Sequence, residues 1–187
     1  TTGSDNYPTT IGCFDNSFNG GTPISAQGVG INYNSGCDIV ISRFSNDGSE
    51  LISSTYIGGS MNDGFNTSND LRYNYGDEIR GEIDFDSEGN CYIASSTQSN
   101  NFPIVNSLVQ PLLKGSQDGI LFKINKDLSN LEWSTFLGGS NNDAIYSLSF
   151  DSEDDVFVSG GTKSINFPTT SNAYQPNYIG GISDAFI

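Results

Sequence analysis

The hydrophobic positions of the chain come in short runs between turn-forming residues, and they predict strands rather than helices. No window repeats apolar residues with the 3.6-residue period of an amphipathic helix. Residues 79–85 and 91–96 flank a tight turn in which Gly89 can adopt the positive φ that such a hairpin needs. Residues 119–124 and 131–137 flank a second turn, NKDLSN. The pattern therefore predicts two successive antiparallel hairpins.

Some of the predicted strands are apolar at three consecutive positions. Successive side chains of a strand point to opposite faces of its sheet, so both faces must be covered where such runs occur. The sequence therefore predicts sheets that pack between neighbouring sheets. The runs are Ile39-Val40-Ile41, Ile120-Leu121-Phe122 and Val156-Phe157-Val158.

Whole phrases recur in the same order, which indicates an internal repeat. STYIGGS at 54–60 returns as STFLGGS at 134–140, and NFPIVNSLVQP at 101–111 returns as NFPTTSNAYQP at 166–176, which is 65 positions later. Where two copies are 80 positions apart, the earlier one carries an insertion of 15 residues. The unit is therefore about 65 residues long, and a fixed period of this length is typical of repeat architectures.

Repeated antiparallel hairpins with both faces covered are what the stacked blades of a β-propeller provide. We expect an all-β fold of four-stranded antiparallel sheets, forming a partial propeller of two to three blades. A β-solenoid is the main rival, but its coils are usually shorter, and a β-sandwich would not need the repetition. SDAFI at the end of the sequence stops where its other copies continue, so we expect a piece of a longer protein. In this interpretation residues 1–187 form part of one propeller domain. The first, partial blade covers 1–60 and carries an insertion at 14–36. The second blade covers 61–140 and carries an insertion near 61–77, and the third, partial blade covers 141–187.

Composition and charge narrow the range of partners. The 187 residues include 22 Asp and Glu but only 7 Lys and Arg, and the net charge is −15. The basic residues stand singly, so neither nucleic acid nor an anionic membrane surface is an expected partner. No apolar run approaches the roughly 20 residues of a membrane-spanning helix. The acidity suits a solvated surface in an extracellular setting.

Candidate chemistry is limited by the absence of histidine from the sequence. Ser-His-Asp and Cys-His nucleophilic sites and His-ligated metals are thereby excluded within this chain. Asp151, Glu153 and Asp155 are candidates for Ca²⁺, which prefers several oxygen ligands, but their spacing is not that of an EF-hand loop and water-facing turn residues explain them better. Asp63 and Asp143 follow the Gly-Gly turns and are expected to order those loops. No catalytic or cofactor-binding residue is predicted.

The three cysteines differ in their surroundings. Cys13 and Cys37 bracket the first insertion, and a disulfide between them would pin a Gly- and Asn-rich loop; two free thiols are the alternative. A disulfide would imply an oxidising compartment outside the cytoplasm. Cys91 takes the place that Val156 has in the other copy, so we expect it to be a buried, small apolar side chain.

The second insertion holds Phe65, Arg72, Tyr73 and Tyr75 among polar residues. This composition could form an aromatic contact surface for a glycan or a protein. The alternative, which we prefer from the sequence, is a loop that packs on its own blade.

The ordered phrases STYIGGS, FDSEGNCYIAS, YPTTIGCFDNSFNGG and NFPTTSNAYQPNYIGGISDAFI resemble the SBBP-type β-propeller repeat. The resemblance covers nearly the whole chain apart from the two insertions, and it departs from the repeat at Asp154, where a turn glycine is usual. It implies a propeller module of large secreted or cell-surface bacterial proteins, many from Bacteroidota, often next to adhesion-like domains. The family has no general catalytic residues to carry over.

The expected function is therefore a non-catalytic interaction or display module of a larger secreted or cell-surface protein. Its partners would be a protein or glycan at the cell surface and further propeller blades of the same chain, with no cofactor, no nucleic acid and no membrane insertion. One alternative is a polysaccharide-acting enzyme, or an enzyme-associated domain, that uses carboxylates. A purely structural spacer is the other.

Overall fold

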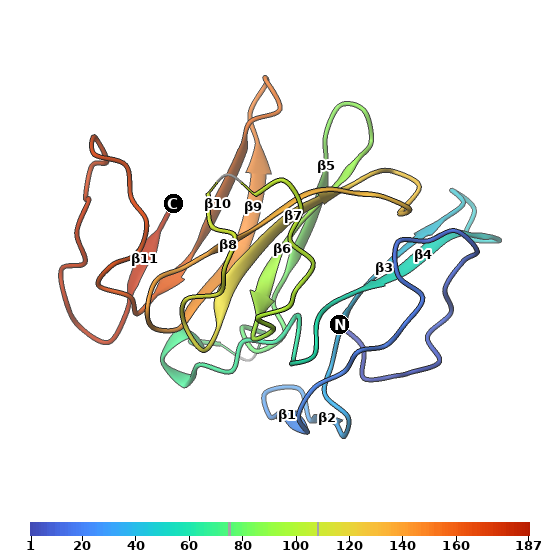
Figure 1. Cartoon of the computed structure of the whole chain (residues 1–187), viewed down its shortest axis with the longest axis horizontal. Coiled ribbons are helices and arrows are strands. Elements are labelled where there is room, and N and C mark those ends of the chain that lie inside the picture. Colours follow the sequence, from blue (N-terminus) through green and yellow to red (C-terminus); the bar gives the residue numbers. More distant parts are fainter. Residues whose placement is uncertain (75, 108) are drawn as a thin grey trace.

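The computed structural model describes residues 1–74, 76–107 and 109–187, and it is all-β, as the sequence predicts. Its regular elements are short strands and one 3₁₀ turn (Figure 1). They are β1 (Ile24–Ala26), β2 (Ile31–Tyr33), β3 (Ile39–Phe44), β4 (Leu51–Ile57), η1 (Asn69–Leu71), β5 (Glu82–Phe85), β6 (Cys91–Thr97), β7 (Asp118–Ile124), β8 (Leu131–Leu137), β9 (Asp143–Phe150), β10 (Val156–Thr162) and β11 (Asp184–Phe186).

The strands form separate antiparallel sheets. The orders are β1-β2, β3-β4, β5-β6-β7-β8 and β11-β10-β9. Both predicted hairpins are confirmed as β5–β6 and β7–β8, and Gly89 has the expected positive φ of 83°. In the β9–β10 turn Asp154 itself adopts a φ of 63°, a region that aspartate tolerates better than most residues. The departure from a turn glycine therefore leaves this hairpin intact.

The four-stranded sheet lies between the β3-β4 sheet and the β9–β11 sheet, so it is covered on both faces (Figure 1). One hydrophobic cluster, the first core, fills the space toward β3-β4 and includes Ile41 and Phe122. The other, the second core, fills the space toward β9 and includes Leu121 and Ile145. Adjacent residues of β7 thus point into different cores, as the consecutive apolar run predicts.

We call the β3-β4 sheet the first sheet, the four-stranded β5–β8 sheet the second and the β9–β11 sheet the third. The outer face of the third sheet is not covered in the same way. Phe157 in β10 is 54 % exposed, whereas Phe122 in β7 is 0 % exposed. No sheet closes on itself in the described part of the chain, and the three larger sheets form an open stack.

The repeated Gly-Gly phrase has a structural role that is the same in both copies. Asp63 accepts hydrogen bonds from Gly59 N at 2.7 Å, from Ser99 Oγ at 2.8 Å and from the hydroxyl of Thr97. Asn101 Oδ1 accepts from Ser60 N at 2.9 Å. The end of β6 thereby holds the loop that leaves β4, and we call this arrangement the first clasp.

The second clasp joins the next pair of sheets with matching residues. Asp143 accepts from Gly139 N at 2.7 Å, from Ser164 Oγ at 2.8 Å and from the hydroxyl of Thr162. Asn166 Oδ1 accepts from Ser140 N at 2.9 Å. The prediction that Asp63 and Asp143 order these loops is confirmed.

The first glycine of each pair leaves room for two buried carboxyl groups. A Cβ on Gly58 would lie 2.8 Å from Asp38 Oδ1 and 2.8 Å from Asp63 Oδ2. A Cβ on Gly138 would meet Asp118 and Asp143 at 2.7 Å. Any larger residue would have to push apart carboxyl groups that are already held by hydrogen bonds.

Burial raises the pKa of these carboxyl groups, to about 7 for Asp63 and to about 6 for Asp38 and Asp118. Asp38 and Asp63 face each other across Gly58, and the buried Cys37 thiol lies nearby. An unfolded chain titrates its aspartates near 3.9, so between these values the folded state binds more protons. The stabilising contribution is complete below about pH 4 and is lost as the pH rises through 6 to 7.

We therefore expect the protein to be more stable at pH 5 than at pH 8, by at least ~2 kcal/mol, because one pKa unit corresponds to ~1.4 kcal/mol. Urea unfolding followed by fluorescence at several pH values measures the effect. Burial also raises the pKa of Asp143, so the double variant Asp63→Asn and Asp143→Asn should reduce the stability difference between pH 5 and pH 8 to the part that Asp38 and Asp118 contribute. A stability that increases from pH 5 to pH 8 would contradict the burial of these groups as the source.

Cys13, Cys37 and Cys91 are all free thiols, so the structure does not contain the predicted Cys13–Cys37 disulfide. Cys37 is buried in a cluster with Tyr33 and Phe65. Cys13 lies in a tight turn, where its backbone N–H donates to Thr10 O at 3.2 Å. The two cysteines that bracket the insertion thus belong to different local environments. Cys91 is 5 % exposed within the first core, which confirms its expected role as a small buried side chain.

The turn between β5 and β6 buries one of its acidic side chains. Asp86 is 8 % exposed, and Lys123 Nζ lies 2.9 Å from its Oδ2. Burial by itself would raise the pKa of Asp86, but hydrogen bonds from Lys123 and Asn90 outweigh it and lower the pKa to about 2. Asp86 therefore serves as a structural ion-pair partner.

Among the described residues, no helix has the length and apolarity that crossing a membrane requires.

Candidate functional site

The two insertions lie together at one end of the stacked sheets (Figure 1). The first forms the β1–β2 hairpin, in which Ile24 pairs with Tyr33 and Ala26 with Ile31. Phe65 of the second insertion packs against this hairpin, and its ring lies 6.2 Å from that of Tyr33 at 84°. Two loops that are separate in the sequence thereby share a small core of their own.

A buried carboxylate strengthens the contact between the insertions. Glu78 is 6 % exposed, and its Oε2 accepts a hydrogen bond from Gly28 N at the tip of the hairpin at 2.8 Å. Its other oxygen, Oε1, pairs with the guanidinium of Arg72. A charge-assisted contact of this kind is stronger than one between neutral groups, so Glu78 positions both the hairpin and Arg72.

A cleft of about 510 Å³ opens between the insertions. The hairpin contributes Ser25, Gln27 and Asn32 to its walls, and the second insertion contributes Thr67, Asn69 and Arg72. Tyr33 and Phe65, at 8 % and 1 % exposed, form the floor. None of the described residues that line the cleft is Asp or Glu, although the chain carries a net charge of −15.

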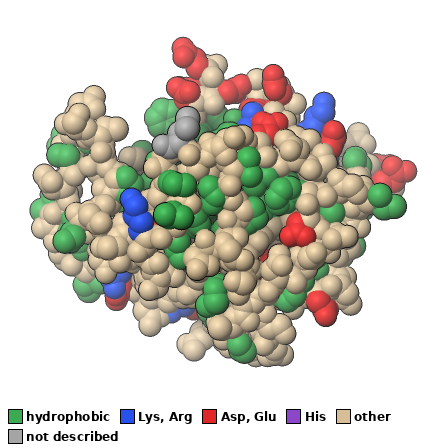
Figure 2. Space-filling model, viewed as in Figure 1, with side chains coloured by type: hydrophobic (Ala, Val, Ile, Leu, Met, Phe, Trp, Pro, Cys, Tyr) green, Lys and Arg blue, Asp and Glu red, His purple; other side chains and the backbone are tan. Residues whose placement is uncertain are grey.

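The distribution of acidic side chains agrees with this view of the cleft. Figure 2 shows one group of them over the β5–β6 and β9–β10 turns, at the end of the sheets opposite to β1–β2, and others at the right-hand side and lower edge of the view. Around the β1–β2 end the visible surface is mainly apolar and uncharged polar, and the acidic residues Asp70 and Glu78 of this end are paired with Lys163 and Arg72. A neutral ligand rich in hydroxyl groups fits such walls, because amide and hydroxyl side chains can both donate to and accept from it.

The structure separates the residues that the sequence grouped as one contact surface. Phe65 is 1 % exposed, so its side chain mainly joins the two insertions and reaches the cleft only as part of its floor. Arg72 lines the cleft, and Tyr73 is 73 % exposed with its hydroxyl paired to that of Ser183. Tyr75 lies outside the described residues. The cleft residues of the β1–β2 hairpin were not singled out, although the alternation of polar and apolar residues in 24–33 is a signal for them.

The preferred alternative, a loop that packs on its own sheet, is confirmed and extended. Gln117, the residue before β7 of the second sheet, donates a hydrogen bond from Nε2 to Asn66 Oδ1 at 2.9 Å. The loop also reaches the third sheet, where Tyr146 Oη donates to the backbone of Leu71 at 2.5 Å and Lys163 pairs with Asp70. The second insertion therefore connects the hairpin, the second sheet and the third sheet.

The calcium candidates lie in the exposed β9–β10 turn. Asp151 Oδ1 accepts hydrogen bonds from the backbone N–H groups of Glu153 at 2.8 Å and Asp155 at 3.0 Å, which is ordinary turn geometry. Over residues 1–74, 76–107 and 109–187, no group of three or more His, Cys, Asp or Glu is arranged to hold a metal ion.

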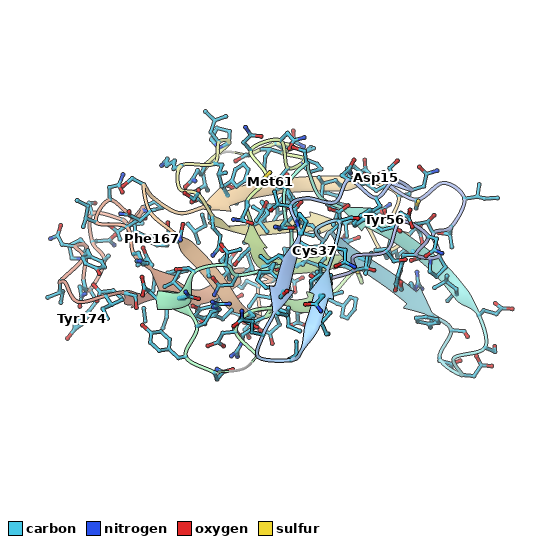
Figure 3. All side chains as sticks on the ribbon, turned by 90° about the horizontal axis from the view of Figure 1, so that it is seen from below. Asp15, Cys37, Tyr56, Met61, Phe167 and Tyr174 are labelled. Carbon is cyan, nitrogen blue, oxygen red and sulfur yellow. The ribbon has the colours of Figure 1, made fainter. Side chains whose placement is uncertain are left out.

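The buried carboxyl groups also have no access to a cleft. Asp38 and Asp63 are both 0 % exposed, and the oxygens of Asp63 are engaged in the first clasp. Figure 3 shows the surroundings from below, with Cys37 and Met61 between Tyr56 at one end and Phe167 and Tyr174 at the other. These groups therefore support the fold rather than line a cleft.

No protein-family model matches the chain, and none of the curated proteins matches it.

Proposed function

We propose that the chain is a non-catalytic interaction module of a larger secreted or cell-surface protein, and that its stacked sheets are blades of a β-propeller. A four-stranded sheet covered on both faces, a repeat with equivalent hydrogen bonds in both copies and the resemblance to the SBBP-type repeat support the propeller. The acidity of the chain and the same resemblance support an extracytoplasmic location.

The cleft between the two insertions is the proposed binding site, and a glycan is the proposed ligand. The observation that carries this proposal is the carboxylate-free cleft wall, where amide, hydroxyl and guanidinium groups surround an aromatic floor. Most enzymes that hydrolyse glycosidic bonds use a pair of carboxyl groups, one on each side of the bond. The described lining of this cleft has neither, so binding rather than hydrolysis is proposed.

Exchange of two exposed amides tests the site. The double variant Gln27→Ala and Asn69→Ala is expected to weaken binding to neutral oligosaccharides on a glycan array by about fivefold or more, since each lost hydrogen bond costs ~0.5–1.5 kcal/mol. Both side chains are exposed cleft residues, so the urea midpoint should stay unchanged.

The matched control is Asn46→Ala, in the exposed β3–β4 turn far from the cleft lining. It should bind as the unmodified protein does. Equal binding by the cleft variant and the control, or no binding of any neutral oligosaccharide by the intact protein, would refute a glycan site in this cleft.

A further inference from the structure

The first residues of the chain repeat the residues that hold the Gly-Gly loops in the two clasps. Each clasp uses a Thr-x-Ser-x-Asn pattern. A third copy occurs at the start of the chain, and it lies 95 positions before the first clasp, which itself lies 65 before the second. The three copies are Thr2, Ser4 and Asn6; Thr97, Ser99 and Asn101; and Thr162, Ser164 and Asn166.

The backbone around this third copy is built as in the two clasps. Thr2 pairs with Asp38 in the antiparallel sense, with Thr2 N to Asp38 O at 2.8 Å and Asp38 N to Thr2 O at 3.0 Å. Thr97 and Thr162 pair with Asp118 and Asp184 in the same way.

The turn after each threonine is also the same. Ser4 N donates to Thr2 Oγ1 at 3.2 Å, and Ser99 N donates to Thr97 Oγ1 at 2.9 Å. The polar side chains of the third copy are therefore placed on the same local framework as those that hold a loop.

What differs is the partner of these polar groups. In the first clasp, Ser99 Oγ donates to Asp63 and Gln98 N donates to Asn62 O at 3.1 Å. At the third copy, Ser4 Oγ donates instead to its own neighbour Asn6, and Gly3 N, which corresponds to Gln98 N, has no partner among the described residues. Asn6 is exposed, and its side-chain oxygen receives no hydrogen bond from the serine of a Gly-Gly loop. The side-chain oxygens of Asn101 and Asn166 do receive such a bond.

We propose that Thr2, Ser4 and Asn6 form a binding site for a Gly-Gly-Ser-x-x-Asp loop of another unit of this repeat. Both loops of this type within the chain, 58–63 and 138–143, are already held, so the occupant belongs to a further unit. Its aspartate would accept from the Thr2 and Ser4 hydroxyls, and its serine would donate to Asn6, as both clasps show. A third clasp would thereby join a further sheet to the β3-β4 sheet. The inference follows from the clasps and is independent of the proposed glycan binding.

The probe for this site is a peptide with the sequence of residues 134–145, STFLGGSNNDAI. Titrated into the isotope-labelled chain to millimolar concentration, it is expected to cause saturable NMR shifts of the amides of Gly3, Ser4 and Asn6. The amides of Ser99 and Ser164, whose clasps are filled, should not shift. A peptide with alanine in place of its aspartate should bind at least about tenfold more weakly, because the two hydroxyl donors lose their acceptor.

The protein variant Thr2→Val with Asn6→Ala is the complementary test. It should lose the shifts while keeping its urea midpoint, since Asn6 is exposed and Thr2 is only partly buried. Absence of shifts at residues 3–6, equal binding of the aspartate-free peptide, or undiminished binding by the variant would each overturn the proposal.

Discussion

Replacing Phe122 by alanine is expected to lower the free energy of unfolding by about 3–5 kcal/mol, the usual cost of truncating a buried phenylalanine. Phe122 lies on β7 in the centre of the four-stranded sheet and is 0 % exposed. Its ring lies 5.8 Å from that of Phe102 within the first core. The large loss is expected because the sheets on both sides prevent the cavity from collapsing.

The matched control for this prediction is Phe157→Ala, which removes the same side chain from the outermost sheet. Phe157 is 54 % exposed, so its truncation should cost about 1 kcal/mol or less. Urea unfolding of the two variants gives the comparison. Equal losses for both would mean that the second sheet is not enclosed more tightly than the third.

Replacing Asp63 by alanine is expected to cost about 3 kcal/mol or more, because it leaves the Gly59 N–H and the hydroxyls of Thr97 and Ser99 without their acceptor. Each buried donor that loses its partner costs ~1–3 kcal/mol. Asp143→Ala should have a similar effect, since the second clasp repeats these contacts. Chemical denaturation at pH 7 measures both.

Asp155→Ala provides the control for the aspartate series. Asp155 is exposed in the β9–β10 turn, and its removal should change the stability by no more than about 0.5 kcal/mol. If Asp63→Ala were as mild as this control, the first clasp would not be a stabilising connection between the sheets.

Part of the fold could be predicted well from local pattern. Gly89 and the NKDLSN turn mark the two hairpins, and the bounds of β8 agree with the predicted 131–137. The strand predicted at 79–85 begins only at Glu82, because Ile79 packs against the cluster that joins the insertions. Turn chemistry acts over a few residues, so it can be read from the sequence, whereas this competing contact depends on a distant hairpin.

The candidate site was predictable only in outline. Both insertions could be identified as extra loops, but their packing against each other depends on how the sheets are stacked. For the same reason Phe65 was expected to face a partner and instead faces Tyr33. The predicted Cys13–Cys37 disulfide failed in a similar way, since neighbouring phrases of the repeat do not place the two thiols in one cluster.

The sequence by itself determined the all-β class, the two hairpins and the repeat, including the glycines and aspartates that recur in the clasps. These features follow from strand periodicity and turn preferences, which act within a few residues and return with every copy. Only the tertiary structure decided that the two insertions meet, that Phe65 and Asp86 are buried and that Thr2, Ser4 and Asn6 stand without a loop. Such outcomes depend on which surfaces compete for burial once the sheets are stacked, and that competition joins residues far apart in the chain.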